Sequence, residues 1–539
     1  VEYCCIARVA YAELPTVKPS SITGEDRWAK ITVKPHGWTA ESGITGRGTE
    51  DDPYILRCAE SFAALRDEVN AGISYAGSFF KLAEDITLPA DWTPIGCLKD
   101  ESVTPGALDY ADKGRNMNPF SGTLDGDGHT LTMAKGSRPL LMFARKATVR
   151  NLNIQGERIV GNGLLERYVI DYGTEGYYNN SVPNTITIEN CHIVGDTNIT
   201  GSGFLSGYAS GLNIVMIVNC SVGEDVVIGC DKDQSEVGSL AGHFNGSVMN
   251  CTSAATVYGK SRVGGLVGYK GQSMGPCSIS SSSFTGKVIA TGDYAGGILG
   301  SGYNQGSAPN SPWATIKGCF VTGSIQGRDG VGGITGGEPG VVQCWDNGIG
   351  GITDNVFYGE IHATGTSVGA IVGTIRSLNK NTLVDNNYYL AGCGTSKGIG
   401  SITTVDTKYK PSTLPKDTEY ICTSDGYTNI FFKDGDYSRE DDPVGKDADK
   451  LSKAVTNTVL KDGTVVQWLN TSESSYHNWM QGTVGPILSN KAIAYDLEIT
   501  GEINQHYVGD ALNLSGLTLT AKWSDGTTTN VPLNDPDLK

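Results

Sequence analysis

Clusters of basic residues are scarce in this chain. Its 539 residues include 41 lysines and arginines against 58 aspartates and glutamates, which gives a formal net charge of −17. Nucleic acids and anionic membranes both favour clustered lysine and arginine, so we expect neither as the main partner. The composition favours a neutral or cationic ligand instead.

Long apolar runs are also missing. The chain contains no uninterrupted apolar stretch of about 18 residues, so we expect no insertion into a membrane. The first residues, VEYCCIARVAYAE, lack the apolar core of a signal peptide. We therefore expect a mature or truncated product, with any secretion signal lying upstream.

Common metal-binding and phosphate-binding signatures are absent as well. No two histidines stand four positions apart, so there is no H-E-x-x-H zinc motif, and there is no P-loop. The 13 cysteines include no pair at C-x2–4-C spacing, apart from the adjacent Cys4 and Cys5. Because their number is odd, a disulfide framework is not expected either.

Glycine, in contrast, is abundant, and much of it belongs to an internal repeat. The chain has 72 glycines, and one glycine and aliphatic signature occurs six times: GFLSG at 203–207, GSLAG at 238–242, GGLVG at 264–268, GGILG at 296–300, GGITG at 332–336 and GAIVG at 369–373. Successive copies begin 26 to 37 residues apart, so the unit tolerates insertions while its signature is kept. This pattern predicts an all-β solenoid, a parallel β-helix of stacked coils.

A second element of the repeat predicts the interior of the coils. Equivalent places are occupied by Cys191, Cys220, Cys251, Cys319 and Asn355. Stacked coils would set these side chains in a column with a spacing of about 4.8 Å, where small thiols or a hydrogen-bonding amide fit a narrow interior. We interpret them as an inward ladder and not as a zinc site.

The chain divides into five regions. Residues 1–36 form an N-terminal extension, and 37–119 form a capping module whose segment 58–72 has helical apolar spacing. Such a cap would cover the exposed strand edges of a solenoid end. The coils with repeats span 120–390, and 391–493 form a C-terminal cap with a helix-like segment at 447–463. Residues 494–539 alternate like strands but are too few for a sandwich domain.

Four motifs in order resemble those of GLUG-motif proteins. They are GTEDDPYIL at 48–56, DWTPIG followed by FSGTLDGDGHTL, the repeated signature, and the closing WMQGTVGPILS. The resemblance covers about residues 40–490, and 494–539 resemble the start of a bacterial immunoglobulin-like domain. It implies a secreted, right-handed parallel β-helix. Location would be extracellular, secreted or attached to the cell wall, and the chain would be a monomeric part of a longer surface protein.

The same resemblance raises one activity that the residues exclude. Some proteins with GLUG motifs are immunoglobulin-cleaving metalloproteases. Because this chain has no H-E-x-x-H motif, we do not expect that activity within it.

An aromatic ladder is predicted at the edge that follows each signature. Tyr208, His243 and Tyr269 directly follow three signatures, and Tyr303 stands near the same place in the next coil. Exposed rings in a column would form a surface on which sugars stack. The alternative is that they cover a coil corner. Insertions at 301–313 and 337–350, the latter with Trp345, would add a wall or cleft to this edge.

One segment before the first signature mixes acids with tyrosines. At 161–180, Asp171 and Glu175 alternate with Tyr168 and Tyr172, and Glu166 precedes them. A glycosidase needs two carboxylates, with rings to hold the sugar. Glu338 and Asp346 on the later insertions are candidates to complete a pair. An irregular polar loop has the same composition, so both interpretations stay open.

A rival carboxylate pair is Asp293 and Asp329. They hold equivalent positions in successive coils and would lie about 5 Å apart at Cα, a spacing close to the carboxyl separation of a retaining glycosidase. Arg262, in the neighbouring coil, is placed to pair with such carboxylates and lower their pKa. The alternative is turn chemistry, which often places aspartate close to glycine.

Calcium is the only cofactor with any support. Oxygen-bearing side chains alternate at Asp434, Asp436, Ser438 and Glu440, which is compatible with calcium binding and also with a solvated loop. Two functions are consistent with these observations. The first is an extracellular glycoside hydrolase acting on host or dietary glycans, and the second is a non-catalytic surface module or adhesin that binds glycan or protein.

Overall fold

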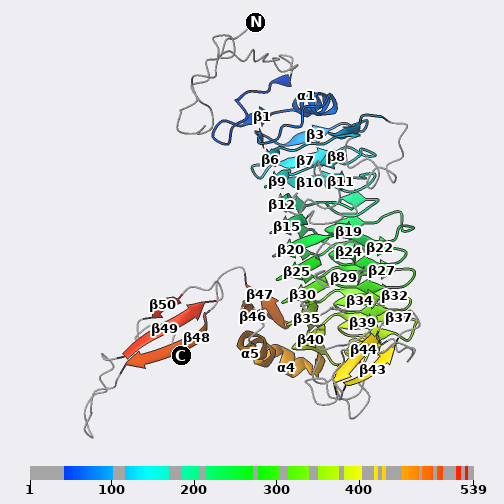
Figure 1. Ribbon diagram of the computed structural model, residues 1–539, viewed down its shortest axis with the longest axis vertical. Coiled ribbons are helices and arrows are strands. Elements are labelled where there is room, and N and C mark those ends of the chain that lie inside the picture. The colour runs from blue at the N-terminus through cyan, green and yellow to red at the C-terminus, as the bar shows by residue number, and fades with distance from the viewer. Residues whose placement is uncertain are drawn as a thin grey trace, which may run out of the picture.

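The computed structural model describes residues 42–100, 116–168, 185–206, 214–270, 277–302, 314–338, 350–375, 382–402, 418–422, 428–432, 452–472, 476, 478–489, 494–501, 517–523 and 528–531. Most strands pair in parallel with the equivalent strand of the next turn of chain. Figure 1 shows these strands stacked in columns along the long axis. The parallel β-helix predicted from the repeats is therefore confirmed.

Five parallel sheets, A to E, run along the stack. Sheet A contains β1 (Tyr54–Leu56), β2 (Phe79–Leu82), β6 (Thr123–Asp125), β9 (Thr148–Arg150), β12 (Thr185–Glu189), β15 (Ile214–Val218), β20 (Gly246–Met249), β25 (Cys277–Ser280), β30 (Ala314–Lys317), β35 (Gly350–Thr353) and β40 (Thr382–Asp385). Sheet B contains β3 (Ile86–Leu88), β7 (Thr130–Met133), β10 (Asn153–Gly156), β13 (His192–Ile193), β16 (Ser221–Val222), β21 (Thr252–Ser253), β26 (Ser283–Phe284), β31 (Phe320–Val321), β36 (Val356–Phe357), β41 (Asn387–Leu390) and β45 (Ser452–Val455).

The remaining three sheets are shorter. Sheet C contains β14 (Asn198–Ile199), β17 (Val227–Ile228), β22 (Thr256–Gly259), β27 (Lys287–Ala290), β32 (Ser324–Gly327) and β37 (Glu360–Ala363). Sheet D contains β18 (Val237–Gly238), β23 (Val263–Gly264), β28 (Ala295–Gly296), β33 (Val331–Gly332) and β38 (Val368–Gly369). Sheet E contains β8 (Leu141–Ala144), β11 (Leu165–Tyr168), β19 (Ala241–Phe244), β24 (Val267–Lys270), β29 (Leu299–Gly302), β34 (Thr335–Glu338), β39 (Val372–Ile375) and β42 (Ile399–Ile402), with Leu205 bridging β11 to β19.

The repeated signature forms the sharp turn from sheet D to sheet E. At Gly264 and Gly332, a methyl group would lie 1.8 and 2.0 Å from the carbonyl oxygens of Val267 and Thr335. Real Cβ atoms do not approach backbone that closely, so only glycine fits the turn. The central aliphatic residue, such as Leu266, is fully buried in the core. The signature thus combines a steric requirement with a hydrophobic anchor.

The predicted inward ladder is present and is hydrogen-bonded from coil to coil. The backbone N–H of Cys191 donates to Cys220 Sγ at 3.4 Å, and that of Cys319 donates to Asn355 Oδ1 at 2.9 Å. Ser282 occupies the coil between Cys251 and Cys319 and accepts from the Cys251 N–H at 3.1 Å. Burial raises the pKa of Cys319 to about 12, so that thiol stays neutral. The cysteines that the structure describes are all free thiols.

The residue before each ladder position turns the corner between sheets A and B. These residues all have positive φ, between 46° and 64°. Asparagine, aspartate and glycine adopt this left-handed conformation most readily, which explains the composition of the corner. Its members are Asn151, Asn190, Asn219, Asn250, Ser281, Gly318, Asp354 and Asn386.

The N-terminal end of the stack is covered by α1 (Ala59–Asn70), as the helical spacing at 58–72 predicts. Phe62, Leu65 and Val69 on one face of the helix are fully buried in the main core. Paired strands extend beyond the expected limits of the coils, because sheet A begins with β1 and sheet B ends with β45. The hairpin β4 (Cys97–Leu98) and β5 (Met117–Asn118) lies in the same region of the chain.

The C-terminal cap packs on the outer face of sheet B. Its helices are α4 (Asn457–Lys461) and α5 (Thr464–Thr471), followed by the hairpin β46 (Trp479–Gln481) and β47 (Pro486–Leu488). A second hydrophobic cluster joins Leu460, Leu469 and Trp479 to Val356 and Tyr388 of sheet B. The helix predicted at 447–463 therefore starts later than expected, because residues 452–455 continue sheet B as β45.

Two antiparallel units complete the described chain. They are the hairpin of β43 (Thr418–Cys422) and β44 (Thr428–Phe432), and the sheet of β48 (Ala494–Gly501), β49 (Leu517–Trp523) and β50 (Thr528–Val531). The second agrees with the alternating pattern in 494–539, and its immunoglobulin-like identity stays a prediction.

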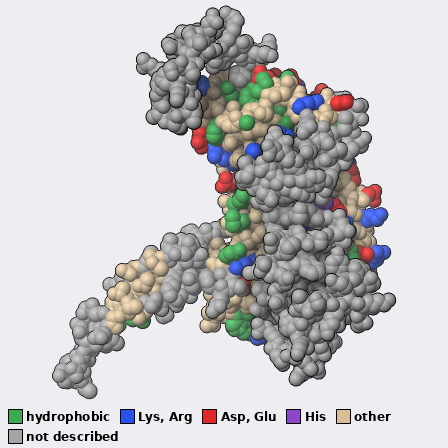
Figure 2. Space-filling model, in the orientation of Figure 1, with side chains coloured by type: hydrophobic (Ala, Val, Ile, Leu, Met, Phe, Trp, Pro, Cys, Tyr) green, Lys and Arg blue, Asp and Glu red, His purple; other side chains and the backbone are tan. Residues whose placement is uncertain are grey.

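The surface carries charges of both signs. Figure 2 shows acidic and basic side chains side by side at the N-terminal end and along one edge of the stack. Among the described residues, no helix is long and apolar enough to cross a membrane.

Candidate functional site

The longest variable segments of the repeats leave the stack at one edge, between sheets E and A, and one shorter insertion, 229–236, lies between sheets C and D. Two of the connections from sheet E to sheet A are short and fully described. Residues 145–147 join β8 to β9, and residue 245 joins β19 to β20. In six other coils the structure describes only the strand residues on either side of the connection. Those connections are 169–184, 207–213, 271–276, 303–313, 339–349 and 376–381. The prediction that insertions follow the signature on one edge is confirmed.

Many of the predicted site residues belong to segments outside the described residues. On these connections lie Asp171, Tyr172, Glu175, Tyr208, Tyr303, Trp345 and Asp346. The calcium candidates Asp434, Asp436, Ser438 and Glu440 are likewise outside the described part of the chain. Tyr168 and Glu338 are the last residues of β11 and β34, so both stand at the edge from which the connections leave.

The stacking order separates the two halves of one predicted carboxylate pair. In sheet E, β11 is followed by Leu205, β19, β24, β29 and β34. Five strand spacings amount to about 24 Å. A glycosidase pair requires carboxyl groups about 5 to 10 Å apart. The strand ends at Tyr168 and Glu338 are therefore farther apart than the two carboxyl groups of a glycosidase, and the connections that follow them lie outside the described residues.

Of the predicted aromatic ladder, the structure describes His243 and Tyr269. His243 and Tyr269 are direct neighbours in the register, with ring centroids 5.1 Å apart in an edge-to-face arrangement. Tyr269 is only 5% exposed, however, and its partner on the next strand is Ser301. An exposed column of rings is therefore wrong for Tyr269, because its ring is covered and packs within the wall of the coil.

A charged cluster surrounds these two rings. Glu236 accepts hydrogen bonds from Arg262 Nη1 at 2.9 Å and pairs with His243 Nδ1 at 3.0 Å. The guanidinium of Arg262 lies 4.4 Å from the Tyr269 ring centroid. Burial alone would raise the pKa of Glu236, but the bonds and charges of His243 and Arg262 outweigh it and lower that pKa. Glu236 is thus an ionised structural acid.

The second predicted pair, Asp293 and Asp329, is stacked as expected, since β28 pairs with β33 in register. Each carboxylate, however, serves a different turn. Asp293 binds the guanidinium of Arg328 through Nε at 2.6 Å and Nη2 at 2.5 Å. Asp329 accepts from the backbone N–H of Ser367 at 2.7 Å. Each carboxylate therefore holds the turn of the following coil, as expected of a structural turn residue.

The predicted arginine partner was misassigned. Arg262 bonds Glu236, and the arginine that holds Asp293 is Arg328, whose hydrogen bond lowers the pKa of Asp293. A lowered pKa keeps a carboxylate ionised and unsuited to protonating a leaving group. The described contacts therefore give no support to Asp293 as a general acid.

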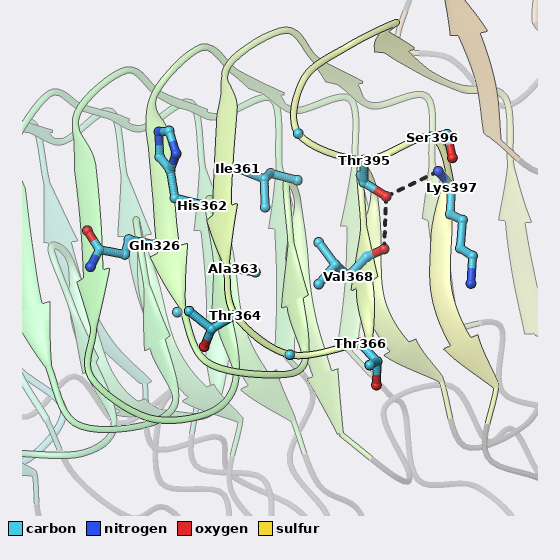
Figure 3. A pocket seen from close by; sticks show the side chains of 13 residues that line it. Gln326, Ile361, His362, Ala363, Thr364, Thr366, Val368, Thr395, Ser396 and Lys397 are labelled. Atoms are coloured by element: carbon cyan, nitrogen blue, oxygen red, sulfur yellow. Dashed lines mark hydrogen bonds between the residues drawn. The ribbon is translucent and has the colours of Figure 1, made fainter.

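A polar groove of about 700 Å³ opens at the C-terminal end of sheet C (Figure 3). Gln326, His362 and Thr364 come from β32 and the region of β37, and Thr395, Ser396 and Lys397 come from the chain that follows β41. His362 Nε2 lies 3.3 Å from Glu360 Oε2. The Thr395 hydroxyl donates to the Val368 carbonyl at 3.1 Å, which fixes this wall.

Two serines at this groove stand in G-x-S-x-G sequences, at 365–369 and 394–398. A nucleophile elbow places its serine between a strand and a helix. Ser367 instead precedes β38, and its hydroxyl lies 3.5 Å from Asp329 Oδ2. No helix follows either serine within the described residues near them. The motif here marks glycine-rich corners.

No group of three or more histidine, cysteine, aspartate or glutamate side chains suited to a metal ion occurs among the described residues. Sequence reasoning missed the role of the asparagines at the corner between sheets A and B. Their signal was present, because an asparagine precedes Cys191, Cys220 and Cys251.

Comparisons with known proteins show that this chain has limited similarity to them. No model of a protein family matches the chain. Halomucin from Haloquadratum walsbyi is 26% identical over 263 residues, which are 47% of this chain and 2% of halomucin. The chain thus spans a very small part of that relative's length. A solved structure, the "putative immunoglobulin A1 protease" from Bacteroides ovatus, has 15% identity and a TM-score of 0.30, covering 82% of this chain and 94% of the other.

Proposed function

We propose that this chain is a glycan-recognising module of an extracellular surface protein, and that it binds through the edge between sheets E and A. The observation that carries the proposal is the gathering of long connections at that one edge of a regular stack. Loops on a rigid scaffold are the usual place for binding residues, because their sequence varies without disturbing the core. The similarity to halomucin supports the extracellular location.

The composition of two neighbouring connections favours a neutral sugar. Residues 303–313 and 339–349 leave from the adjacent strands β29 and β34. They contain Tyr303, Trp313 and Trp345 but no lysine or arginine, and Asp346 is their only carboxylate. Aromatic rings present flat apolar faces to sugar rings. The absence of basic residues from these two segments argues against an acidic polysaccharide.

Glycoside hydrolysis is the second candidate. Glu338 ends β34 at this edge, and Asp346 follows in the same connection beside Trp345. Two carboxylates with a neighbouring ring are the minimum that such an enzyme needs. Both carboxylates belong to one strand end and its connection, whereas the strand end at Tyr168 lies five strand spacings from Glu338.

The test is retention of the whole chain on an array of oligosaccharides, followed by mass spectrometry of the incubated sugars. We expect retention that is lost in a Tyr303→Ala, Trp345→Ala variant and kept in a Tyr258→Ala control, because Tyr258 lies on sheet C. Release of shorter sugars, abolished by Glu338→Gln or Asp346→Asn, would establish the hydrolase. Retention of no sugar would overturn both candidates.

A further inference from the structure

A second groove, of about 900 Å³, runs along the outer face of sheet B, away from the edge that bears the connections. It crosses the coils that contain β13, β16, β21, β26 and β31. From His192 to Phe320 this is four strand spacings, about 19 Å. Its lining comes from these coils and from the C-terminal cap, and it includes Asn219, Asn250, Thr252 and Tyr476.

The C-terminal cap forms one wall of this groove. Tyr358 anchors the hairpin β46–β47 by donating its hydroxyl to the Pro486 carbonyl at 2.8 Å. Phe320 packs against Trp479, with ring centroids 6.4 Å apart, and Lys317 Nζ lies 4.4 Å from the Tyr476 ring centroid. Because these contacts fix the cap to the coils, the groove is a preformed feature and not a gap between separate parts.

The floor of the groove presents regularly spaced polar groups. Asn219 and Asn250 have φ of 56° and 54°, so the left-handed corner fixes their backbones one strand spacing apart. Both side chains are exposed. Within the part of the chain that the structure describes, neither amide group makes a hydrogen bond, whereas His192 Nδ1 and Ser221 Oγ share one of 2.7 Å. The two amides are thus open to a ligand.

The lining also selects the chemistry of that ligand. None of the described lining residues is aspartate, glutamate, lysine or arginine. Amides and hydroxyls both donate and accept hydrogen bonds, which suits a molecule that is rich in hydroxyl groups. At the cap end, Tyr476 is 41% exposed. Lys317 lies over its ring, and the part of the ring that Lys317 leaves exposed supplies a surface on which a sugar can stack.

We propose that this groove is a second binding site, for an uncharged oligosaccharide lying along the axis of the β-helix. The inference rests on the proposed function for its class of ligand, but it uses different residues on a different face. The corner asparagines bind the hydroxyl groups of the sugar, and Tyr476 stacks against a ring at the cap end.

The test compares two variants of the whole chain on an array of neutral, sulfated and uronic-acid oligosaccharides. Asn219→Asp, Asn250→Asp replaces two amide donors with acceptors and keeps residues that tolerate positive φ. Gln234→Glu is the matched control, an exposed amide between sheets C and D that lines neither of the two grooves. A Thr252→Val variant removes one exposed hydroxyl of the floor without touching the corner.

We expect affinity for a neutral oligosaccharide to fall about tenfold or more in the asparagine variant, because two hydrogen bonds are lost, and to stay unchanged in Gln234→Glu. Thr252→Val is expected to weaken binding less. Binding that is lost in Tyr303→Ala, Trp345→Ala but unchanged in the asparagine variant would overturn the second site and leave the proposed function intact. If the asparagine variant lost binding only to acidic oligosaccharides, the second site would also be overturned. Retention of no sugar by the parent chain would overturn both proposals.

Discussion

At the scale of single residues, the interior ladder shows how one position stabilises the stack. Asn355 accepts from the Cys319 N–H at 2.9 Å and donates to the Ile316 carbonyl and to Asn387 Oδ1, both at 3.0 Å. Its side chain is fully buried, so each of these partners lies out of reach of water. Buried polar groups that lose their partners are costly.

Asn355→Ala is therefore expected to lower the free energy of unfolding by about 3 kcal/mol, since it leaves a buried N–H and a buried carbonyl without partners. Cys251→Ser is the control, because Ser282 already holds the equivalent place one coil on. Urea denaturation of both variants measures the difference. Equal losses in the two would contradict the ladder as a hydrogen-bonded element.

The charged cluster around Glu236 predicts a dependence on pH. Its pKa is lowered from the usual 4.5, although burial opposes this, because His243 and Arg262 bind the ionised form. A carboxylate whose pKa is lower in the folded state than in the unfolded state stabilises the fold at pH values above its unfolded-state pKa. This stabilisation is lost as the pH falls through the folded-state pKa. The contribution is therefore present at pH 7 and disappears on acidification below about pH 4.5.

Glu236→Gln should consequently be less stable than the parent chain at pH 7 by about 1 to 2 kcal/mol. The difference should shrink as the pH is lowered below the unfolded pKa. Thermal unfolding of both chains at several pH values checks this. A difference that stays constant from pH 7 to pH 3 would rule out the ionised carboxylate as its source.

At the scale of elements, the turn between sheets D and E limits what each coil can contain. In the five signatures that begin at Gly238, Gly264, Gly296, Gly332 and Gly369, a side chain on the first glycine would meet a backbone carbonyl of its own turn, and that backbone also belongs to strands paired with neighbouring coils. Strain at this point cannot be relieved by moving a flexible side chain. Each signature is thus a fixed point between variable segments.

Gly264→Ala is expected to be strongly destabilising, by more than about 3 kcal/mol, because its Cβ would lie 1.8 Å from the Val267 carbonyl oxygen. Gly223→Ala is the matched control, since its nearest neighbour would lie at 3.5 Å, an ordinary contact. Chemical denaturation compares the two. Similar stability of the two variants would show that the turn tolerates a side chain.

The periodic parts of this chain could be predicted from sequence, and the side-chain contacts between coils could not. The signature and the ladder of Cys191, Cys220 and Cys251 repeat in sequence because every coil obeys the same sterics. The pairing of Asp293 with Arg328 depends on which side chain of the next coil reaches back. Sequence spacing alone does not show which arginine reaches Asp293, so the prediction that Arg262 pairs with it was wrong.

The candidate site was predictable only in its location. Insertions after the signature identify one edge, because connections of variable length do not disturb paired strands. The burial of Tyr269 follows from the local packing with His243 and Arg262, which no periodicity encodes. The groove on sheet B arises where a cap distant in sequence meets the coils, so a linear pattern does not reveal it.

At the scale of the whole molecule, the ligands proposed for both binding faces are neutral sugars. The chain has an excess of acidic residues, and the two faces proposed for binding contain aromatic, amide and hydroxyl groups rather than clustered lysine and arginine. Recognition by such groups differs from ionic binding in its response to salt, since exposed charges more than about 10 Å apart are screened at 0.1 M salt.

The most direct test is therefore binding of the whole chain to matched neutral and acidic oligosaccharides at low and high ionic strength. We expect binding of a neutral sugar with an affinity that changes less than about twofold between the two salt concentrations. Binding only to acidic sugars, with an affinity that collapses as salt is added, would contradict it.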